Sequence, residues 1–273
     1  MRSILSAGAT DVGRCREGNE DSFLILPDQG LFVIADGMGG YQSGKVASAL
    51  AIKEIGAWFT QHRPFLSEIE GVRALRGAVT QASDSVYAAS RQSCRGKMGT
   101  TVVGALAYER KLFIACVGDS RAYLRRRHSF VQLTRDQTMA TALVDQGLYA
   151  TDEEARRTMN PAYARALNQF VGSQYSLNIA LTAVDLRRGD ALLLCSDGLT
   201  GMLTDAVIMA VLSTETDPAN ACAKLIELAN AAGGEDNITA IVARFEGDDL
   251  SPPTPQDVAD LKREPYVLAP SAV

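Results

Sequence analysis

Histidine is scarce in this chain, whose 273 residues include only His62 and His128. An H-E-x-x-H zinc site is therefore excluded. The five cysteines are scattered and form no C-x-x-C pair, so their spacing gives no support to a cysteine–histidine zinc site. If the chain binds a metal, we expect oxygen ligands. The odd number of cysteines, with Cys116 and Cys195 inside apolar runs, fits a reducing compartment without disulfides.

An excess of positive charge is also missing, and so is any long apolar run. The net charge is −5, so nucleic acid is not an expected partner, because domains that bind it carry a basic face. The longest apolar runs are roughly eight residues, which is too short to span a bilayer. The N-terminal stretch MRSILSAGATD has no hydrophobic segment of secretory length. We therefore expect a cytoplasmic protein without a membrane span.

Short β-rich runs and helical periodicities are mixed along the chain without strict alternation. The expected helices cover residues 43–59, 72–86, 137–158 and about fourteen residues that open at Asp217-Pro218. From residue 99 onward, β-rich runs are separated by tight connections at 109–111, 118–120 and 125–128, which predicts antiparallel hairpins. Further strands are expected at 21–36, 178–184, 190–196 and 237–245. The pattern predicts an α+β fold with antiparallel sheets.

Two familiar motifs are only partly matched. The stretch from Gly39 to Lys45 has the G-x-x-x-x-G-K spacing of a phosphate-binding loop, but Val46 stands where a serine or threonine should hold magnesium. A dinucleotide fingerprint that starts at Gly37 fails because Gln42 replaces its third glycine. The stretch GDSRA (118–122) is close to a nucleophile elbow, but a strand pattern follows it instead of a helix. Nucleotide binding and serine hydrolysis are therefore disfavoured.

Aspartates recur at the ends of the β-rich runs. They are Asp36 before Gly37, Asp119 after LFIACVG, Asp197 before Gly198, and Asp236 before the last strand. One such aspartate would be interpreted as a turn residue that bonds its own backbone. Four of them indicate strands that emerge at one end of a sheet and bring carboxylates together, and their mutual repulsion requires a counter-charge. Oxygen ligands of this kind favour Mg²⁺ or Mn²⁺.

Carboxylates that hold two such cations predict a definite chemistry. A pair of hard cations lowers the pKa of a shared water towards 7, and the hydroxide can attack phosphorus in line without a covalent intermediate. A protein cation should complete the grip on phosphate, preferably an arginine, because its planar fork matches phosphate geometry. Arg16, in GRCREGNEDS just before the first expected strand, is the candidate.

Seven ordered blocks resemble the metal-dependent protein phosphatases (PPM, type 2C), and more closely their bacterial single-domain branch. They are GATDVGRCREGNEDSF, VIADGMGG, MGTTVVGA, VGDSRAYL, LTRDQT, LLLCSDGLTGML and GGEDNITAIV. The resemblance covers about residues 7–245. It implies a serine/threonine phosphoprotein phosphatase with a four-layer α-β-β-α sandwich of two antiparallel sheets flanked by helices. The phosphatase domain would span 1–247, with a variable flap at about 137–175. Residues 248–273, rich in proline and charge, are expected to form a mobile tail.

The resemblance also assigns roles to residues. Asp36 would bridge two metals and the Gly37 carbonyl would bind one of them, while Asp197 and Asp236 hold the other. Asp119 with Asp197 would hold a third, weaker ion. The remaining roles fall to Arg16, which binds the substrate phosphate, to Glu20 and Asp21, which act on the metals through water, and to Asn237, which supports the metal-binding turn. The catalytic set would be Arg16, Asp36 and Asp197.

Two departures from the family pattern bear on mechanism. Met38 stands where eukaryotic members often have a histidine, the usual candidate for the acid that protonates the leaving alcohol, so that acid is left unassigned. Gln137 stands where bacterial relatives often have histidine. Alternatives to a general phosphatase are a catalytically weak regulator that binds phosphoproteins, and a partner-switching phosphatase that acts on an anti-sigma antagonist. The expected partners are phosphoserine and phosphothreonine proteins and an opposing kinase, with the chain a monomer.

Overall fold

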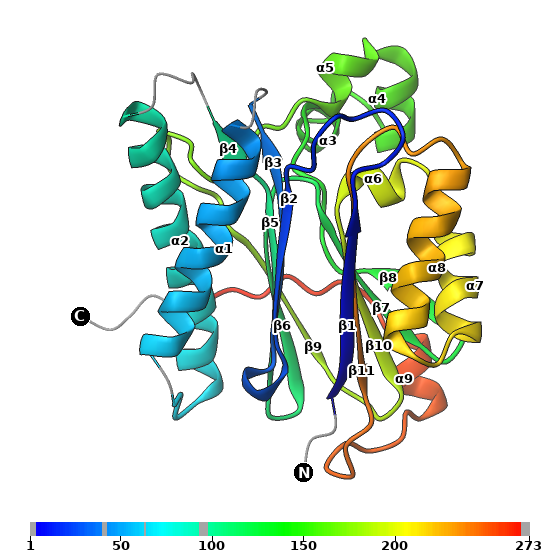
Figure 1. Ribbon diagram of the computed structural model, residues 1–273. Coiled ribbons are helices and arrows are strands. Elements are labelled where there is room, and N and C mark those ends of the chain that lie inside the picture. Colours follow the sequence, from blue (N-terminus) through cyan, green and yellow to red (C-terminus); the bar gives the residue numbers. More distant parts are fainter. Residues whose placement is uncertain (1–3, 40–42, 63, 93–97, 269–273) are drawn as a thin grey trace.

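Two antiparallel sheets form the centre of the molecule (Figure 1). The computed structural model describes residues 4–39, 43–62, 64–92 and 98–268. The five-stranded sheet has the order β1-β11-β10-β7-β8, with β1 Ile4–Asp11, β7 Arg121–Arg126, β8 Ser129–Gln132, β10 Asp190–Cys195 and β11 Ile238–Phe245. The second sheet has the order β2-β3-β5-β6-β9, and the short β4 pairs with β3. Its strands are β2 Asp21–Leu26, β3 Leu31–Met38, β4 Gly99–Thr100, β5 Val102–Tyr108, β6 Lys111–Val117 and β9 Ala180–Asp185.

Helices cover the outer faces of both sheets, so the four-layer α-β-β-α architecture is confirmed (Figure 1). The helices α1 (Ser43–Gln61) and α2 (Glu68–Gln92) lie over the second sheet, and α7 (Asp205–Thr214) and α8 (Pro218–Ala231) lie over the five-stranded sheet. The short elements are η1 Pro27–Gln29, α3 Met139–Asp145, α4 Asp152–Thr158, α5 Pro161–Arg165, α6 Asp197–Thr200 and α9 Pro255–Ala259. Among the described residues, no helix combines the length and hydrophobicity that a membrane crossing requires.

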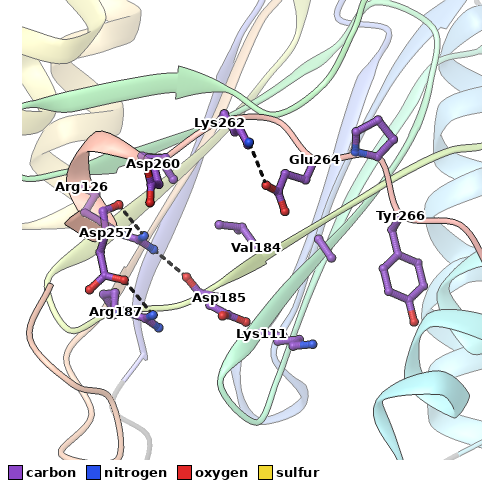
Figure 2. A pocket seen from close by; sticks show the side chains of 13 residues that line it. Lys111, Arg126, Val184, Asp185, Arg187, Asp257, Asp260, Lys262, Glu264 and Tyr266 are labelled. Atoms are coloured by element: carbon purple, nitrogen blue, oxygen red, sulfur yellow. Dashed lines mark hydrogen bonds and ion pairs between the residues drawn. The ribbon is translucent and has the colours of Figure 1, made fainter. Parts of the chain in front are cut away.

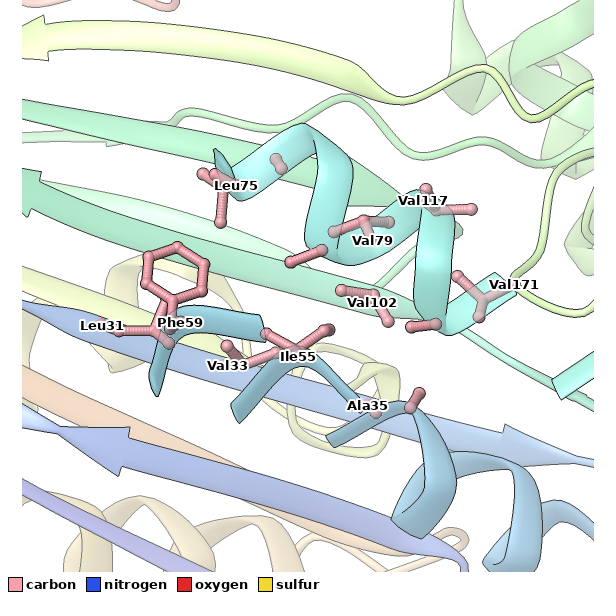
Figure 3. Packing of buried hydrophobic residues seen from close by; sticks show 14 of the residues in the cluster. Leu31, Val33, Ala35, Ile55, Phe59, Leu75, Val79, Val102, Val117 and Val171 are labelled. Carbon is pink, nitrogen blue, oxygen red and sulfur yellow. The ribbon is translucent and has the colours of Figure 1, made fainter. Parts of the chain in front are cut away.

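The strand β3 is buried on both faces, which explains its unbroken apolar sequence. Leu31, Val33 and Ala35 pack against α1 and α2 in the cluster drawn in Figure 3. Phe32 and Ile34 point the other way, into the core between the two sheets. A strand in the middle of a sandwich therefore has no solvent face to carry polar residues. This burial holds the C-terminal end of β3, and with it Asp36, in a fixed position.

One connection differs from the hairpins that the sequence predicts. The β5–β6 and β7–β8 hairpins are confirmed by their antiparallel registers. However, β6 and β7 belong to different sheets, so the 118–120 connection crosses the sandwich. Gly118 allows the crossing, because its φ is +101° and a side chain there would collide with Thr101. The β9–β10 connection crosses in the same way.

Several smaller elements also depart from the sequence prediction. The helix expected over 137–158 is two helices, α3 and α4, and Gly147 between them has a φ of +77°. The sequence did not predict β1, which pairs with β11 along its full length. It also did not predict α7, whose Ile208, Val211 and Leu212 are buried against the five-stranded sheet.

The C-terminal segment, expected to be a mobile tail, instead packs against the domain as far as residue 268. Leu250 and Leu261 enter the core between the sheets. Residues 264–266 run antiparallel to the edge strand β9, with Tyr266 N donating to Leu181 O at 2.8 Å. This pairing covers backbone groups that an edge strand would otherwise leave open. Figure 2 shows the pocket of about 390 Å³ between this segment and β9.

A buried ion pair anchors the same region. Arg126 Nε and Nη2 donate to the two carboxylate oxygens of Asp190 at 2.9 and 2.7 Å. The side chains are 4% and 0% exposed. Arg126 also donates to the backbone carbonyls of Asp185 and Asp257, which joins the five-stranded sheet to β9 and α9.

Candidate metal centre

A cavity of about 1140 Å³ lies at one end of the sandwich, and four aspartates line it. Asp36 comes from the end of β3 in the second sheet, and Asp119 comes from the β6–β7 connection, which crosses between the sheets. Asp197 begins α6 directly after β10, and Asp236 precedes β11, both on the five-stranded sheet. The carboxylates therefore meet across two sheets instead of along the end of one, which corrects the expectation from strand order.

The cavity gathers nearly the whole set of residues predicted from the sequence. Besides the four aspartates, its lining includes Arg16, Glu20, Gly37 and Asn237. Asp21 is the exception, because it lies directly opposite Asp36 in the β2–β3 register and is 8% exposed. Residues opposite each other in an antiparallel pair present their side chains to the same face. Asp21 therefore lies behind the cavity, next to Asp36.

One oxygen of Asp21 has no partner in the part of the chain that the structure describes. Its Oδ2 accepts hydrogen bonds from Thr239 Oγ1 at 2.6 Å and Ser196 Oγ at 2.8 Å. Its Oδ1 is buried without a hydrogen bond among the described residues. Burial raises the pKa of Asp21 to about 6, and the nearby Asp197 and Asp236 contribute to the rise. A buried polar atom without a partner is costly, so this oxygen fits a water or ion that the protein itself does not supply.

Burial and mutual repulsion raise the pKa of three of these carboxylates, Asp36, Asp119 and Asp197. Burial raises the pKa of Asp119 to about 8, and the charge of Asp197 adds to the effect. Asp36 has a pKa well above its usual value, first because it is buried and then because Asp21 and Asp197 are close. The pKa of Asp197 is raised by burial and by Asp236. A cation is the natural counter-charge for such a cluster.

The backbone of Asp36 is clamped by two threonines. Asp36 N donates to Thr101 Oγ1 at 3.1 Å, and its carbonyl accepts from Thr101 N and Thr100 Oγ1, each at 2.8 Å. Thr101 Oγ1 is also 2.7 Å from Ser120 Oγ, next to Asp119. These bonds fix the position of Asp36 relative to the β6–β7 connection. No separate sequence signal marks Thr101 and Ser120 beyond their place in the quoted blocks.

Gly37 and Gly44 lie backbone against backbone. A Cβ on Gly37 would overlap the Gly44 carbonyl, and a Cβ on Gly44 would lie 2.6 Å from Gly37 C and 2.5 Å from Glu20 Oε2. The start of α1 can therefore approach the end of β3 only if both residues are glycine. This contact explains the second glycine of the stretch that resembles a phosphate-binding loop. Gly40, Tyr41 and Gln42 of that stretch lie outside the described residues.

Asn237 ties together the turn that presents Asp236. Its Oδ1 accepts from Glu20 N at 2.8 Å, and its Nδ2 donates to the carbonyls of Val12 and Gly18 at 2.9 and 3.0 Å. Asp236 Oδ1 accepts from Asn237 N at 2.8 Å. The sequence predicted this supporting position for Asn237, and these are the bonds it makes.

Arginines provide the positive charge at the cavity. Arg16 Nη2 donates to Asp236 Oδ2 at 2.6 Å, and this bond raises the pKa of Arg16. Arg165, from α5, also lines the cavity, and its charge partly opposes the rise in the pKa of Asp197 that burial and Asp236 cause. Residue-by-residue reading of the sequence missed Arg165, because it lies in the flap segment NPAYARALNQFVGS, which has no periodicity or motif to mark it. Lys45 lines the cavity as well.

The donor set fits a hard, partly hydrated divalent cation. The cavity offers carboxylates and the Gly37 carbonyl, which are the ligand types that Mg²⁺ and Mn²⁺ prefer, and the Asp21 oxygen without a described partner lies behind it. Within the described ranges, no three acidic, histidine or cysteine side chains already converge on one point as a closed ligand cluster. Ions that keep several waters do not need such a cluster, because one or two carboxylates and water complete their shell.

Comparisons with known proteins agree with this donor set. A model of the family described as protein phosphatase 2C matches residues 15–241. The serine/threonine phosphatase stp of Listeria monocytogenes is 33% identical over 238 residues, which is 85% of this chain and 92% of that protein. A crystal structure of the Mycobacterium tuberculosis serine/threonine phosphatase PstP/Ppp is 33% identical, with a TM-score of 0.80 over 90% of this chain and 100% of the other. The catalytic domain of PstP in complex with two manganese ions is 31% identical, with a TM-score of 0.77 over 90% of this chain and 100% of that one.

Proposed function

Because the chain belongs to the protein phosphatase 2C family, we infer that it is a serine/threonine protein phosphatase that hydrolyses phosphate monoesters on proteins. The family and the manganese-containing relative support divalent cations as its cofactor. We further propose two core ions of Mn²⁺ or Mg²⁺, with a third, weaker one. The observation that carries the proposal is the half-buried cluster of Asp36, Asp119, Asp197 and Asp236, whose charges need cations.

The proposal gives each of these groups a role. Asp36, the Gly37 carbonyl, Asp197 and Asp236 would hold the two core ions, and Asp119 with Asp197 would hold the third. When bound, such ions supply a nucleophile from water at neutral pH and offset charge on the phosphate. Asp21 would act on the ions through water, because its Oδ1, which has no hydrogen bond to any described residue, can accept one from a water of the site.

Arg16 has the task of binding phosphate. Its side chain lines the cavity and is 55% exposed, although one nitrogen already donates to Asp236. A guanidinium has five N–H donors, so Arg16 can keep that bond and still donate to phosphate oxygens. Asp236 then fixes the orientation of Arg16. In this proposal water attacks the phosphorus directly, so no covalent intermediate would form on the protein.

The group that protonates the leaving alcohol is unassigned. Met38 lines the cavity at the position where eukaryotic relatives often have histidine, and no histidine is among the described lining residues. The side chain of methionine carries no exchangeable proton. We propose water in the cavity as one proton source that needs no side chain.

The test compares turnover of a phosphothreonine peptide by the wild type and by two substituted chains. Asp36→Asn and Asp236→Asn should each lower kcat/KM on the order of 10²-fold or more in the presence of manganese. A chelator should abolish wild-type turnover. Asp28→Asn is the matched control, since Asp28 is exposed in η1 and is not among the residues that line the cavity. Turnover that survives both substitutions, or is indifferent to the chelator, would exclude the proposed mechanism.

The same assay separates the alternatives. A regulator that only binds phosphoproteins would bind the phosphothreonine peptide and release no phosphate from it. A partner-switching enzyme would hydrolyse a phosphorylated anti-sigma antagonist and leave general phosphopeptides intact. We also propose that the chain opposes a serine/threonine kinase and acts in the cytoplasm as a monomer, which its sequence predicts.

A further inference from the structure

A smaller lobe adjoins the candidate metal centre. This lobe, here called the flap-side lobe, has a volume of about 390 Å³. It is lined by residues of the flap region, among them Thr138, Arg156 and Arg165, and by α6 and the residues that follow it. Arg16 and Asp197 line both the flap-side lobe and the larger cavity, so the two spaces adjoin. A substrate held at the metal centre would therefore place neighbouring groups beside this lobe.

Two arginines share a single carboxylate in the flap-side lobe. Arg121 Nε and Nη2 donate to the two oxygens of Asp136 at 2.8 and 2.7 Å. Arg156 Nη2 donates to Asp136 Oδ2 at 2.9 Å. Asp136 is 8% exposed. Because one carboxylate faces two guanidinium groups, the group formed by Arg121, Arg156 and Asp136 carries a net positive charge next to the candidate metal centre.

The surplus charge is accessible on Arg156. The Arg121 side chain is 17% exposed, and its Nη1 already donates to the Tyr123 hydroxyl at 2.9 Å. The Arg156 side chain is 44% exposed and forms its ion pair with Asp136 through Nη2. Most of its five N–H donors remain available. Four more carboxylates line the lobe, namely Glu235 and the candidate metal ligands Asp119, Asp197 and Asp236, but no ion pair among the described residues joins any of them to Arg121 or Arg156.

We propose that the flap-side lobe is a subsite for an anionic group that flanks the phosphorylated residue of the substrate, with Arg156 as its main contact. The shared chemistry is an oxyanion, which is either the carboxylate of an aspartate or glutamate or a second phosphate. An extended peptide advances about 3.3 Å per residue, so a side chain within three residues of the phosphoresidue can reach an adjoining lobe. This inference rests on the proposed function and names the substrate class of that same site.

The test compares kcat/KM for pairs of peptides between wild type and Arg156→Ala. Phosphothreonine peptides that differ only by glutamate or glutamine, placed at each of the three positions on either side, are hydrolysed by wild type and by Arg156→Ala. Wild type should favour glutamate on one side by roughly threefold to tenfold in kcat/KM, and Arg156→Ala should lose that preference. A third peptide set with a second phosphothreonine in place of glutamate identifies which oxyanion is preferred.

Two further variants separate recognition from folding. Arg157→Ala is the matched control, because Arg157 is exposed on the same helix α4 and forms no ion pair with any described residue. It should keep the wild-type preference. Arg156→Lys keeps the charge and should retain much of the preference. The preference should also shrink as salt rises, since exposed charges are screened over about 10 Å at 0.1 M, whereas a merely structural role for Arg156 would not respond in this way.

Different outcomes would contradict the anionic subsite and the proposed phosphatase function. Hydrolysis of the glutamate, glutamine and second-phosphothreonine peptides at equal rates would overturn the subsite and leave the phosphatase proposal intact. A glutamate preference that persists in Arg156→Ala, or that disappears in Arg157→Ala, would also overturn the assignment to Arg156. Failure of wild type to hydrolyse any peptide would count against the proposed function itself.

Discussion

The close approach of β3 and α1 makes Gly44→Ala an informative substitution. A Cβ at position 44 would lie 2.6 Å from Gly37 C, 2.8 Å from Gly37 O and 2.5 Å from Glu20 Oε2. Two of these atoms belong to the backbone and cannot rotate away, so the collision should cost about 3 kcal/mol, the upper end for overpacking. Alanine returns up to about 1 kcal/mol through its helix propensity. The expected net loss in the free energy of unfolding is therefore about 2 kcal/mol.

Gly56→Ala provides the matched control in the same helix. There the added Cβ would lie 3.3 Å from Leu24 Cδ2, and a side-chain methyl group can give way. This variant should be more stable than wild type by roughly 0.5 kcal/mol, because the helix propensity gain is almost unopposed. In melting temperature, Gly44→Ala should fall by about 4–8 °C, and Gly56→Ala should rise by a degree or two.

The assay is urea unfolding in the presence of chelator, followed by fluorescence. Trp58, the only tryptophan of the chain, lies on α1 and stacks on His62, so it reports directly on this helix. A calorimetric titration with Mn²⁺ tests the second consequence. Because a methyl group at position 44 would displace the Gly37 carbonyl, a predicted metal ligand, the half-saturating Mn²⁺ concentration should rise about tenfold or more.

The result can refute each part of this reasoning. Equal stability of Gly44→Ala and Gly56→Ala would mean that β3 and α1 do not approach as described. A loss of stability with unchanged affinity for Mn²⁺ would keep the packing contact but remove the Gly37 carbonyl from the metal site.

Three further predictions concern charge and the C-terminal segment. Because burial raises the pKa of Asp21 to about 6 and of Asp119 to about 8, the metal-free native chain binds more protons than the unfolded chain, and its free energy of unfolding should fall as pH rises from about 4 to about 8. Arg126→Ala leaves the fully buried Asp190 without its cation and should cost about 3–5 kcal/mol in urea unfolding. Truncation after Gly247 removes buried leucines and the cover of β9, so it should cost at least about 3 kcal/mol and raise binding of a hydrophobic dye.

Each of these has a clear contrary result. A metal-free stability that rises between pH 4 and pH 8 would mean that these carboxylates ionise as readily in the native chain as in the unfolded one. An Arg126→Ala chain as stable as wild type would show that Asp190 is solvated. A truncated chain with wild-type stability would restore the mobile tail expected from composition.

The candidate site could largely be predicted from the sequence, since its signals are local. The run LFVIA before Asp36 predicts a buried strand, and the structure places Leu31 and Phe32 in two different cores. Asp197 and Asp236 were also identified from their position at strand ends. The order of residues along one strand determines which side chain stands at its end, so no knowledge of the other strands was needed.

The pairing of the strands could not be predicted in this way, because it depends on which sheet edge is free. The connections at 109–111 and 118–120 are equally short, yet the first closes a hairpin and the second crosses between sheets. Turn chemistry describes the bend and says nothing of the edge that the next strand joins. The C-terminal segment is similar, since its composition predicts disorder, while the open edge of β9 offers it backbone partners.

The sequence by itself determined the strand-end aspartates, the oxygen-ligand chemistry and the resemblance that leads to a phosphatase. Only the tertiary structure decided that Asp21 keeps an unpartnered oxygen among the described residues, that Gly44 must be glycine because of Gly37, and that Arg121 and Arg156 meet on Asp136. The physical reason is the same in each case. These properties arise between residues that are separated along the chain, and only the packing of two sheets, the helices and the flap brings them into contact.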